Sequence, residues 1–401
     1  MSEILDEVER HALGRRLDHA ARGLADLAFP LMVVDLDAFD ANADDLVRRA
    51  AGKPVRVASK SLRVPALLER ALAHDGFGGV LAYTLREALW LCEEGISDDV
   101  VMGYPSVDSS ALQRLVDSDA ARAAVTLMVD DVAQLDLVPT RPGEPVRVAI
   151  DVDAGLRLRH QHVGPKRSPL FDVDDVAALA RRIVDRPGLR LVGVMTYEGQ
   201  VAGVQDALPG PKSLIVRRLK QASVAQLTER RSAIAAALGE IADLEFWNAG
   251  GSGSVETTVA DPVVTEVAAG SGLLVPALFD HYESFEPRPA SFFAVPVVRR
   301  PNEDVATVAG GGFAASGAAG KDRLPLPWAP PGLQLTGLEG AGEVQTPLAG
   351  PGAHRLAVGD LVWFRHAKSG EPAEHTDVVH LVRGSDVVET VSTYRGLGHA
   401  W

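Results

Sequence analysis

Strand-like and helix-like segments alternate from about residue 31 to residue 271, and this alternation limits the fold more than any other feature. Strand, helix, strand in repetition indicates parallel pairing with right-handed crossovers, and eight such units close a barrel. The sequence offers nine strand-like runs, one too many, at residues 31–39, 54–60, 78–84, 99–105, 124–130, 145–155, 189–199, 244–251 and 262–271. We expect the first to precede the barrel, so that 54–60 becomes barrel strand one.

The chain changes character near residue 285. After it come short β-like runs such as FFAVPVVRR and VVETVSTY, separated by stretches rich in glycine and proline. This pattern predicts a separate all-β domain. The predicted fold is therefore α/β, with a TIM-type (β/α)8 barrel over residues 31–284 and a C-terminal β-domain over 285–401. Residues 1–30 contain an amphipathic helix pattern, expected to pack on the rest.

Composition and charge restrict the class of protein. With 46% apolar and 23% charged residues, the chain is typical of globular proteins. No segment has the length of a membrane span, and the charged N-terminus lacks the apolar region of a secretory signal, so a cytoplasmic location is expected. A net charge of −14 argues against nucleic acid or an anionic membrane as partner. The single cysteine, Cys92, has the helical spacing of a core residue.

The first barrel strand carries a lysine at its end. In VRVASKSLRVP, Val55 and Val57 alternate at strand spacing, and Lys60 follows between Ser59 and Ser61. The C-terminal ends of barrel strands are where such folds keep their chemistry. A lysine held there, partly desolvated and near other cations, has its pKa pushed down and becomes a nucleophilic amine. A solvated lysine leaving a strand is the alternative.

Polar residues also follow two later strands. Residues 155–169 (GLRLRHQHVGPKRSP) hold many cations, which suggests a nearby anion, although a solvated basic loop would look the same. The strand at 189–199 ends in the polar tip TYEGQ. Such a tip is expected of a ligand-facing loop or of ordinary helix capping.

Glycine-rich turns follow the last two strands, in NAGGSGS (248–254) and AAGSG (268–272). Backbone N–H groups in such turns can hold a phosphate, and this is the usual phosphate position in a barrel. The first turn is neither a Walker loop, since no GK[ST] follows, nor a convincing dinucleotide fingerprint. A strand-end lysine facing a phosphate cradle is the layout expected for pyridoxal 5'-phosphate.

The order of the motifs resembles a known family. VDLDAFDAN, VASKSLRVP, DVDAGLRL, MTYEGQ, NAGGSGS and TEVAAGS are similar to the alanine-racemase-like, fold type III pyridoxal-phosphate enzymes. Within them the chain looks most like the branch of D-threonine aldolase and D-serine dehydratase, especially an amino acid deaminase/aldolase group. The resemblance runs from about residue 28 to the C-terminus, and GGGFAASGAAGKDRLPLP is among its most specific parts.

The resemblance implies roles for individual residues. Lys60 matches the lysine that carries the cofactor, and Arg157, or failing that Arg159, takes the place of the arginine near the pyridine ring. The other residues implied to face the cofactor are His162, Ser168, Tyr197, Gly250, Gly251, Ser252, Gly270 and Ser271. In such enzymes the β-domain of one subunit closes the barrel of another, so a homodimer is expected.

The sequence departs from the resemblance at the metal site. Relatives are similar in carrying a His-x-Asp or His-x-Cys pair that binds a divalent ion, whereas this chain has His366, Ala367 and Lys368. Lysine is a poor metal ligand, and its charge would instead hold the substrate carboxylate or polarise a leaving hydroxyl. The pair His375 and Asp377 restores the spacing nine residues later, and would bind zinc or manganese or form an ordinary polar loop.

The function implied is that of a pyridoxal-phosphate lyase acting on a small D-amino acid with a 3-hydroxyl. Dehydration with deamination would use Lys60 as the base at Cα, with Lys368 or a metal at the leaving hydroxyl. Aldol cleavage needs a base near the hydroxyl, for which His366 is the candidate. The alternatives are an amino-acid racemase, a non-catalytic pyridoxal-phosphate homeostasis protein, and a barrel that binds no cofactor.

Overall fold

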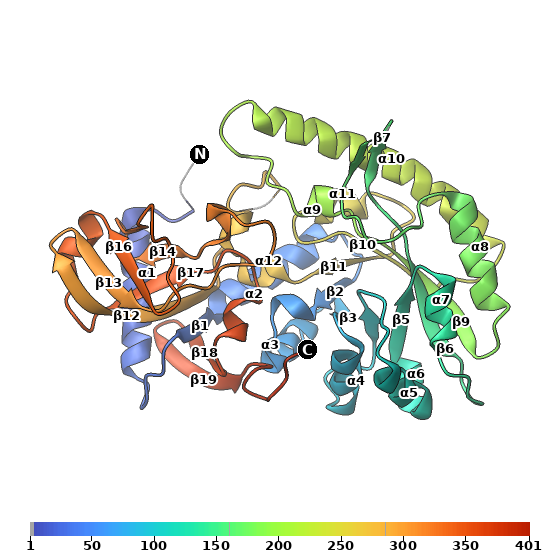
Figure 1. Ribbon diagram of the computed structural model, residues 1–401, viewed down its shortest axis with the longest axis horizontal. Coiled ribbons are helices and arrows are strands. Elements are labelled where there is room, and N and C mark those ends of the chain that lie inside the picture. Colours follow the sequence, from blue (N-terminus) through green and yellow to red (C-terminus); the bar gives the residue numbers. More distant parts are fainter. Residues whose placement is uncertain (1–3, 160, 285) are drawn as a thin grey trace.

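A closed parallel barrel and a β-domain make up the protein, which is described from a computed structural model covering residues 4–159, 161–284 and 286–401 (Figure 1). The barrel strands run in the order β10-β11-β2-β3-β4-β5-β6-β9. Their bounds are β2 Val55–Ala58, β3 Phe77–Ala82, β4 Val100–Met102, β5 Val125–Val129, β6 Val146–Asp151, β9 Leu189–Thr196, β10 Phe246–Ala249 and β11 Glu266–Ala269. The predicted barrel is confirmed, with Lys60 directly after its first strand.

Helices cover the outside of the barrel, and the longest of them, α10, crosses its rim beside α8 (Figure 1). The helices between the strands are α2 Leu36–Arg49, α3 Pro65–Leu72, α4 Leu85–Glu93, α5 Ser109–Asp117, α6 Asp119–Ala124, α7 Val132–Asp136, α8 Val173–Val184, α9 Gly199–Ala202, α10 Lys212–Gly239, α11 Val255–Val259 and α12 Ser271–Leu274. Side-chain caps define several starts; Thr84, for example, accepts a hydrogen bond from the backbone of Glu87. Cys92 packs against the core, as predicted.

The β-domain follows the barrel and forms a nine-stranded sheet. Its strands are β12 Ser291–Asn302, β13 Val305–Ala309, β14 Leu326–Ala329, β15 Gln334–Leu335, β16 Gln345–Ala349, β17 Leu361–Arg365, β18 Val378–Arg383 and β19 Asp386–Ser392, with β1 Leu31–Asp35 as the ninth. Residue 285, the expected start of this domain, lies outside the described residues.

Strand β1 belongs to the β-domain sheet although it precedes the barrel in sequence. It pairs antiparallel with β12 and parallel with β18. All five of its residues are buried. The strand is shorter than the run 31–39 that the sequence suggested, because the carboxylate of Asp35 accepts hydrogen bonds from the backbone of Asp37 and Ala38 and so starts α2.

Helix α1, Glu7–Arg22, packs on the β-domain and contacts β14 and β19. Its start is fixed by a capping box in which Asp6 and Glu9 bind each other's backbone N–H. Leu13 and Leu17 are buried in a cluster that includes Trp328. Among the described residues, no helix combines the length and the apolar character that a membrane crossing requires.

Candidate active site

A cavity of about 270 Å³ opens at the C-terminal ends of the barrel strands, where the β-domain meets the barrel. Backbone bonds join the two parts beside it: Ala277 donates to the carbonyl of His366, and Tyr394 donates to that of Arg63, both at 2.9 Å. The polar residues that line the cavity are Lys60, Ser61, Arg63, Tyr104, Arg167, Tyr197, Asn248, Ser252, Ser271, Tyr282, Ser316, Arg323, Lys368, Ser369 and Glu371.

Lys60 lies on a short 3-10 turn, Ser59–Ser61, that ends strand β2. The two neighbouring serines are buried and fix this turn on both sides. Ser59 Oγ donates to the carbonyl of Leu81 on β3 at 3.1 Å, and Ser61 Oγ lies 3.0 Å from Ser271 Oγ after β11. The turn therefore presents the Lys60 side chain to the cavity from a fixed backbone.

Tyr104 is a cavity residue that the sequence reasoning missed. It follows strand β4 in the motif VMGYP, so the same strand-end rule that identified Lys60 could have found it. The Lys60 ammonium donates to Tyr104 Oη at 2.7 Å. Burial alone would raise the pKa of Tyr104, but the positive charges of Lys60, Arg167 and Lys368 outweigh it and lower that pKa below its usual range.

Arg167, rather than Arg157 or Arg159, is the arginine of residues 155–169 that lines the cavity. Its guanidinium lies 5.6 Å from the ring centres of both Tyr104 and Tyr197. The other two arginines do not line the cavity: Arg157 lies on β7 Leu156–Leu158, which pairs with β8 Gln161–Val163 in a hairpin, and Arg159 follows β7. The guanidinium of Arg157 stacks on Phe171 at 3.6 Å instead.

His162 and Ser168 support this loop and do not line the main cavity. His162 Nε2 lies 2.9 Å from Asp153 Oδ2, which joins the hairpin to the segment after β6. Ser168 Oγ donates to the carbonyl of Asp151 at 2.7 Å. Both residues thus fix the backbone on either side of Arg167.

All five residues predicted to bind a phosphate lie at the cavity: Gly250, Gly251, Ser252, Gly270 and Ser271. Gly250 has a φ of +79°, a conformation that favours glycine. A Cβ on Gly251 would lie 3.0 Å from the Cβ of Ala202, and one on Gly270 would lie 2.5 Å from the carbonyl oxygen of Ala58. Glycine at these positions therefore lets the two turns pack closely against α9 and the end of β2 while their residues line the cavity.

A buried ionic network holds the first of these turns. Glu198, 2% exposed, accepts from the backbone N–H of Gly250 at 3.1 Å and from Thr258 Oγ1 at 2.5 Å. Arg231 lies 3.1 Å from Glu198 and 3.3 Å from Asp261. In the predicted polar tip after β9, Tyr197 faces the cavity, whereas Glu198 lies beneath the turn and positions it.

The β-domain contributes Lys368 to the cavity. Its ammonium donates to Ser316 Oγ at 2.6 Å, while Glu371 accepts from the backbone N–H of Ser316 at 2.8 Å. Burial lowers the pKa of Lys368, and the nearby charges of Lys60 and Arg323 lower it further, against the opposite effect of Glu371.

His366 lies behind the cavity wall. It is 3% exposed, and its Nε2 is 3.1 Å from Ser369 Oγ, which does line the cavity. Burial lowers its pKa to about 3, helped by the positive charge of Arg365, so the imidazole is neutral near pH 7. The predicted base therefore reaches the cavity only through Ser369.

His375 and Asp377 do not fit a metal site. The His375 ring stacks on Phe313 at 4.1 Å, and Asp377 Oδ1 lies 3.1 Å from Arg395 Nε. Within the described ranges, no three His, Cys, Asp or Glu residues are placed to hold an ion together. The spacing that suggested a metal pair belongs to two side chains with different partners.

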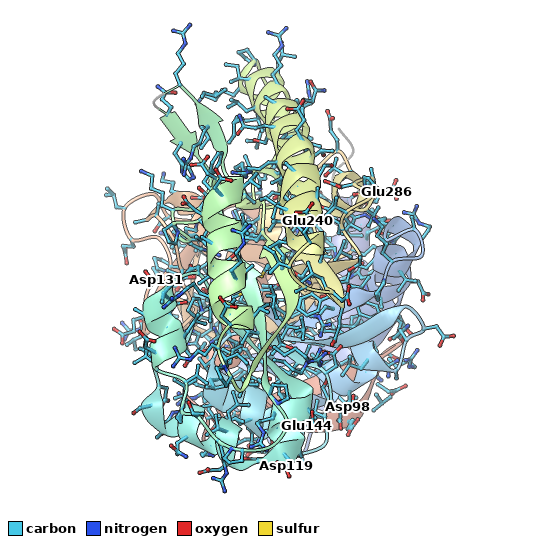
Figure 2. The ribbon with its side chains drawn as sticks, turned by 90° about the vertical axis from the view of Figure 1, so that its right-hand side faces the viewer. Asp98, Asp119, Asp131, Glu144, Glu240 and Glu286 are labelled. Atoms are coloured by element: carbon cyan, nitrogen blue, oxygen red, sulfur yellow. The ribbon has the colours of Figure 1, made fainter. Side chains whose placement is uncertain are left out.

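The charges of the cavity fit an anionic cofactor. Its lining holds one carboxylate, Glu371, and five cations, Lys60, Arg63, Arg167, Arg323 and Lys368. Figure 2 shows Asp98, Asp119 and Glu144 at the other end of the barrel; Asp98 and Glu144 come just before β4 and β6, and Asp119 starts α6. Lys60 suits the aldehyde of pyridoxal 5'-phosphate, Arg167 suits its ring, and the glycine turns suit its phosphate.

Comparison with known proteins supports this fit. The family model of the alanine racemase N-terminal domain matches residues 34–275. A D-threonine aldolase from Arthrobacter sp is 29% identical over 255 residues, and the match spans 62% of this chain but only 61% of that protein.

Solved structures extend the similarity over nearly the whole chain. D-threonine aldolase from Filomicrobium marinum has a TM-score of 0.75 at 22% identity, covering 93% of this chain and 96% of that one. D-threo-3-hydroxyaspartate dehydratase from Delftia sp. HT23 gives 0.73 at 21% identity, covering 94% and 98%. Alanine racemase from Corynebacterium glutamicum gives 0.54 at 20% identity, covering 83% and 88%. These structures confirm the barrel followed by a β-domain, and the matched family model shows that the chain belongs to the family of the alanine racemase N-terminal domain.

Proposed function

We propose that the protein is a pyridoxal-phosphate-dependent lyase acting on small D-amino acids that carry a 3-hydroxyl. One observation carries the proposal: Lys60 and Lys368 line the same cavity as the glycine cradle. The similarity to D-threonine aldolase and to D-threo-3-hydroxyaspartate dehydratase supports the same substrate class.

Different residues of the cavity would bind different parts of the cofactor. Pyridoxal phosphate, when bound, supplies the electron sink that stabilises negative charge at the substrate Cα. Lys60 would hold its aldehyde carbon, Gly250, Gly251, Ser252, Gly270 and Ser271 its phosphate, and Arg167 with Tyr197 its ring.

Two further roles belong to the β-domain. The Lys368 ammonium provides positive charge for the substrate carboxylate or for the leaving hydroxyl, in the absence of a residue set that fits a metal within the described ranges. His366 orients Ser369 at the wall of the cavity and is a positioning residue in this proposal.

Racemisation receives less support from the cavity. It requires a second base opposite Lys60, for which Tyr282 and Tyr394 are the tyrosines near the C-terminal third. Tyr282 lines the cavity, but its Oη donates to the carbonyl of Ala202 at 3.0 Å. Tyr394 does not line the cavity, and its Oη donates to buried Glu87 at 2.9 Å. Within this subunit, both hydroxyls are committed to structural partners.

The proposal also covers the oligomeric state and the location of the protein. We propose a homodimer, which light scattering of the purified protein would show as twice the mass of the chain. A cytoplasmic location fits a chain with a single cysteine and therefore no intramolecular disulfide.

The test is a product assay with the protein loaded with pyridoxal phosphate. D-threonine, D-serine and D-3-hydroxyaspartate, with their L-enantiomers as controls, are each incubated with and without a chelator. Glycine plus an aldehyde would indicate aldol cleavage, whereas ammonia plus an α-keto acid would indicate dehydration. We expect turnover of at least one D-substrate, unaffected by the chelator. Turnover of none, or formation of the opposite enantiomer alone, contradicts the proposal.

A further inference from the structure

The contact between Lys60 and Tyr104 has no role in the function proposed so far. Lys60 Nζ and Tyr104 Oη are 2.7 Å apart, and both side chains line the cavity. Lys60 is the donor in this hydrogen bond, so its N–H points at the phenol oxygen. In the proposed function, the same Lys60 nitrogen must bind the cofactor and later move a proton. Tyr104 therefore touches a reacting atom.

The chemistry of the two groups suits exchange of a proton. Isolated lysine and tyrosine side chains have pKa values of about 10.4 and about 10, so transfer between them costs little free energy. The surrounding cations lower the pKa of Tyr104 below its usual range despite burial. At 2.7 Å, the Lys60 nitrogen and the Tyr104 oxygen are close enough for direct transfer of a proton.

The other charged groups around the pair come from every side of the cavity. Burial raises the pKa of Tyr197, and burial holds His366 neutral behind Ser369. The charged side chains that share the cavity with Lys60 and Tyr104 are Arg63, Arg167, Arg323, Lys368 and Glu371. Of these, Glu371 is an acid, and it accepts from the backbone of Ser316. Among the described cavity residues, Tyr104 is thus the acid–base group whose oxygen is hydrogen-bonded to Lys60.

We propose that Tyr104 is a catalytic residue that shares the proton of Lys60, an inference that rests on the proposed function. When Lys60 has taken a proton from the substrate Cα, its ammonium passes that proton to the Tyr104 oxygen. The N–H bond breaks as the O–H bond forms, so a phenolate becomes a phenol and the ammonium becomes an amine. The pair can then return the proton to the product or to the leaving group.

The substitution Tyr104→Phe tests this without changing the size of the ring. Loss of an acid–base group of this kind lowers kcat by about 10²- to 10⁴-fold. The second measurement uses the full chain prepared without cofactor: capture of Lys60 by pyridoxal phosphate and borohydride is followed against pH, with peptide mapping. The phenol oxygen stabilises the ammonium form of Lys60, whereas only the amine form reacts with the aldehyde. Without that oxygen, Lys60 should therefore be captured at lower pH.

Tyr104→Phe should lower both kcat and the pH at which Lys60 is captured, a combination expected only if Tyr104 acts on the proton of Lys60. Tyr83→Phe is the matched control, because Tyr83 does not line the cavity and lies against Arg63 at 5.2 Å. It should change neither readout. Capture at an unchanged pH in Tyr104→Phe, or an unchanged kcat, overturns the inference. Absence of capture in the wild-type chain would instead refute the proposed cofactor.

Discussion

At the scale of single residues, Glu87 combines complete burial with a carboxylate. It is 0% exposed, and its oxygens accept from the backbone N–H of Tyr83 at 2.8 Å and from Tyr394 Oη at 2.9 Å. Burial nevertheless dominates and raises its pKa to about 7. The residue joins α4 to the C-terminal segment, close to the turn that carries Lys60.

This carboxylate should make stability depend on pH. The folded protein binds its proton below about 7, whereas the unfolded chain releases it above about 4.5, so the free energy of unfolding falls as pH rises between these values. The shift corresponds to about 3 kcal/mol. Glu87→Gln should remove this fall, as measured by urea unfolding at pH 5 and pH 8. Exposed Glu69→Gln is the control, and parallel curves for Glu87→Gln and the wild type would contradict the prediction.

Individual residues also show how much of the site could be predicted from the sequence. Lys60, Tyr197 and the glycine turns follow from one rule, since each comes directly after a barrel strand. Arg167 does not follow from it, because the hairpin β7-β8 lengthens its loop and no local pattern says which arginine returns to the mouth. The position of His366 does not follow from local sequence either, because its burial behind Ser369 is a result of tertiary packing.

At the scale of elements, the turn after β11 packs tightly against strand β2. Gly270 lies against the end of β2, with Ala58 O and Ser61 Cβ at 2.5 and 3.0 Å from where a Cβ would stand. One side of this contact is backbone, so it cannot yield by a change of rotamer. The position of the cradle relative to Lys60 therefore depends on the missing side chain.

Gly270→Ala should separate the cradle from the lysine turn. Overpacking of this kind costs about 1–3 kcal/mol, and a cost of that size in the cofactor-bound form would lower pyridoxal-phosphate affinity about 5- to 150-fold. An absorption titration with the cofactor measures this. Gly239→Ala, where a Cβ meets nothing within 4 Å, should leave the affinity unchanged. Equal affinities for the two variants would show that the cradle does not hold the phosphate.

Element order in the sequence predicted the barrel but not the membership of β1. The sequence predicts one extra strand before the barrel. The two-residue alternation of its side chains does not determine which sheet that strand joins. The pairing with β12 and β18 is set by residues more than 250 positions away.

At the scale of the whole molecule, the N-terminus and the C-terminal domain form one unit. Helix α1 is fastened to the sheet by Trp363 Nε1, which donates to Asp18 at 2.8 Å, and by an ion pair between Arg16 and Asp35 of β1. Leu17 is 0% exposed beneath the helix. The fold of the β-domain therefore depends on residues at both ends of the chain.

Leu17→Ala should destabilise the protein by about 2–5 kcal/mol, the usual cost of such a truncation in a core. Val8→Ala on the same helix removes a side chain that is 74% exposed and should change stability by less than about 0.5 kcal/mol. Urea unfolding of both variants measures the difference. Equal stabilities would mean that α1 is not packed on the β-domain in solution.

The central claim is that Lys60 carries pyridoxal phosphate. The most direct measurement is the visible absorption spectrum of the purified protein with added cofactor, before and after borohydride, followed by peptide mapping of the reduced adduct. We predict a visible band that borohydride abolishes and a pyridoxyl group on Lys60. No band, or an adduct on another lysine, would contradict the account and leave a barrel with an unassigned anionic-ligand site.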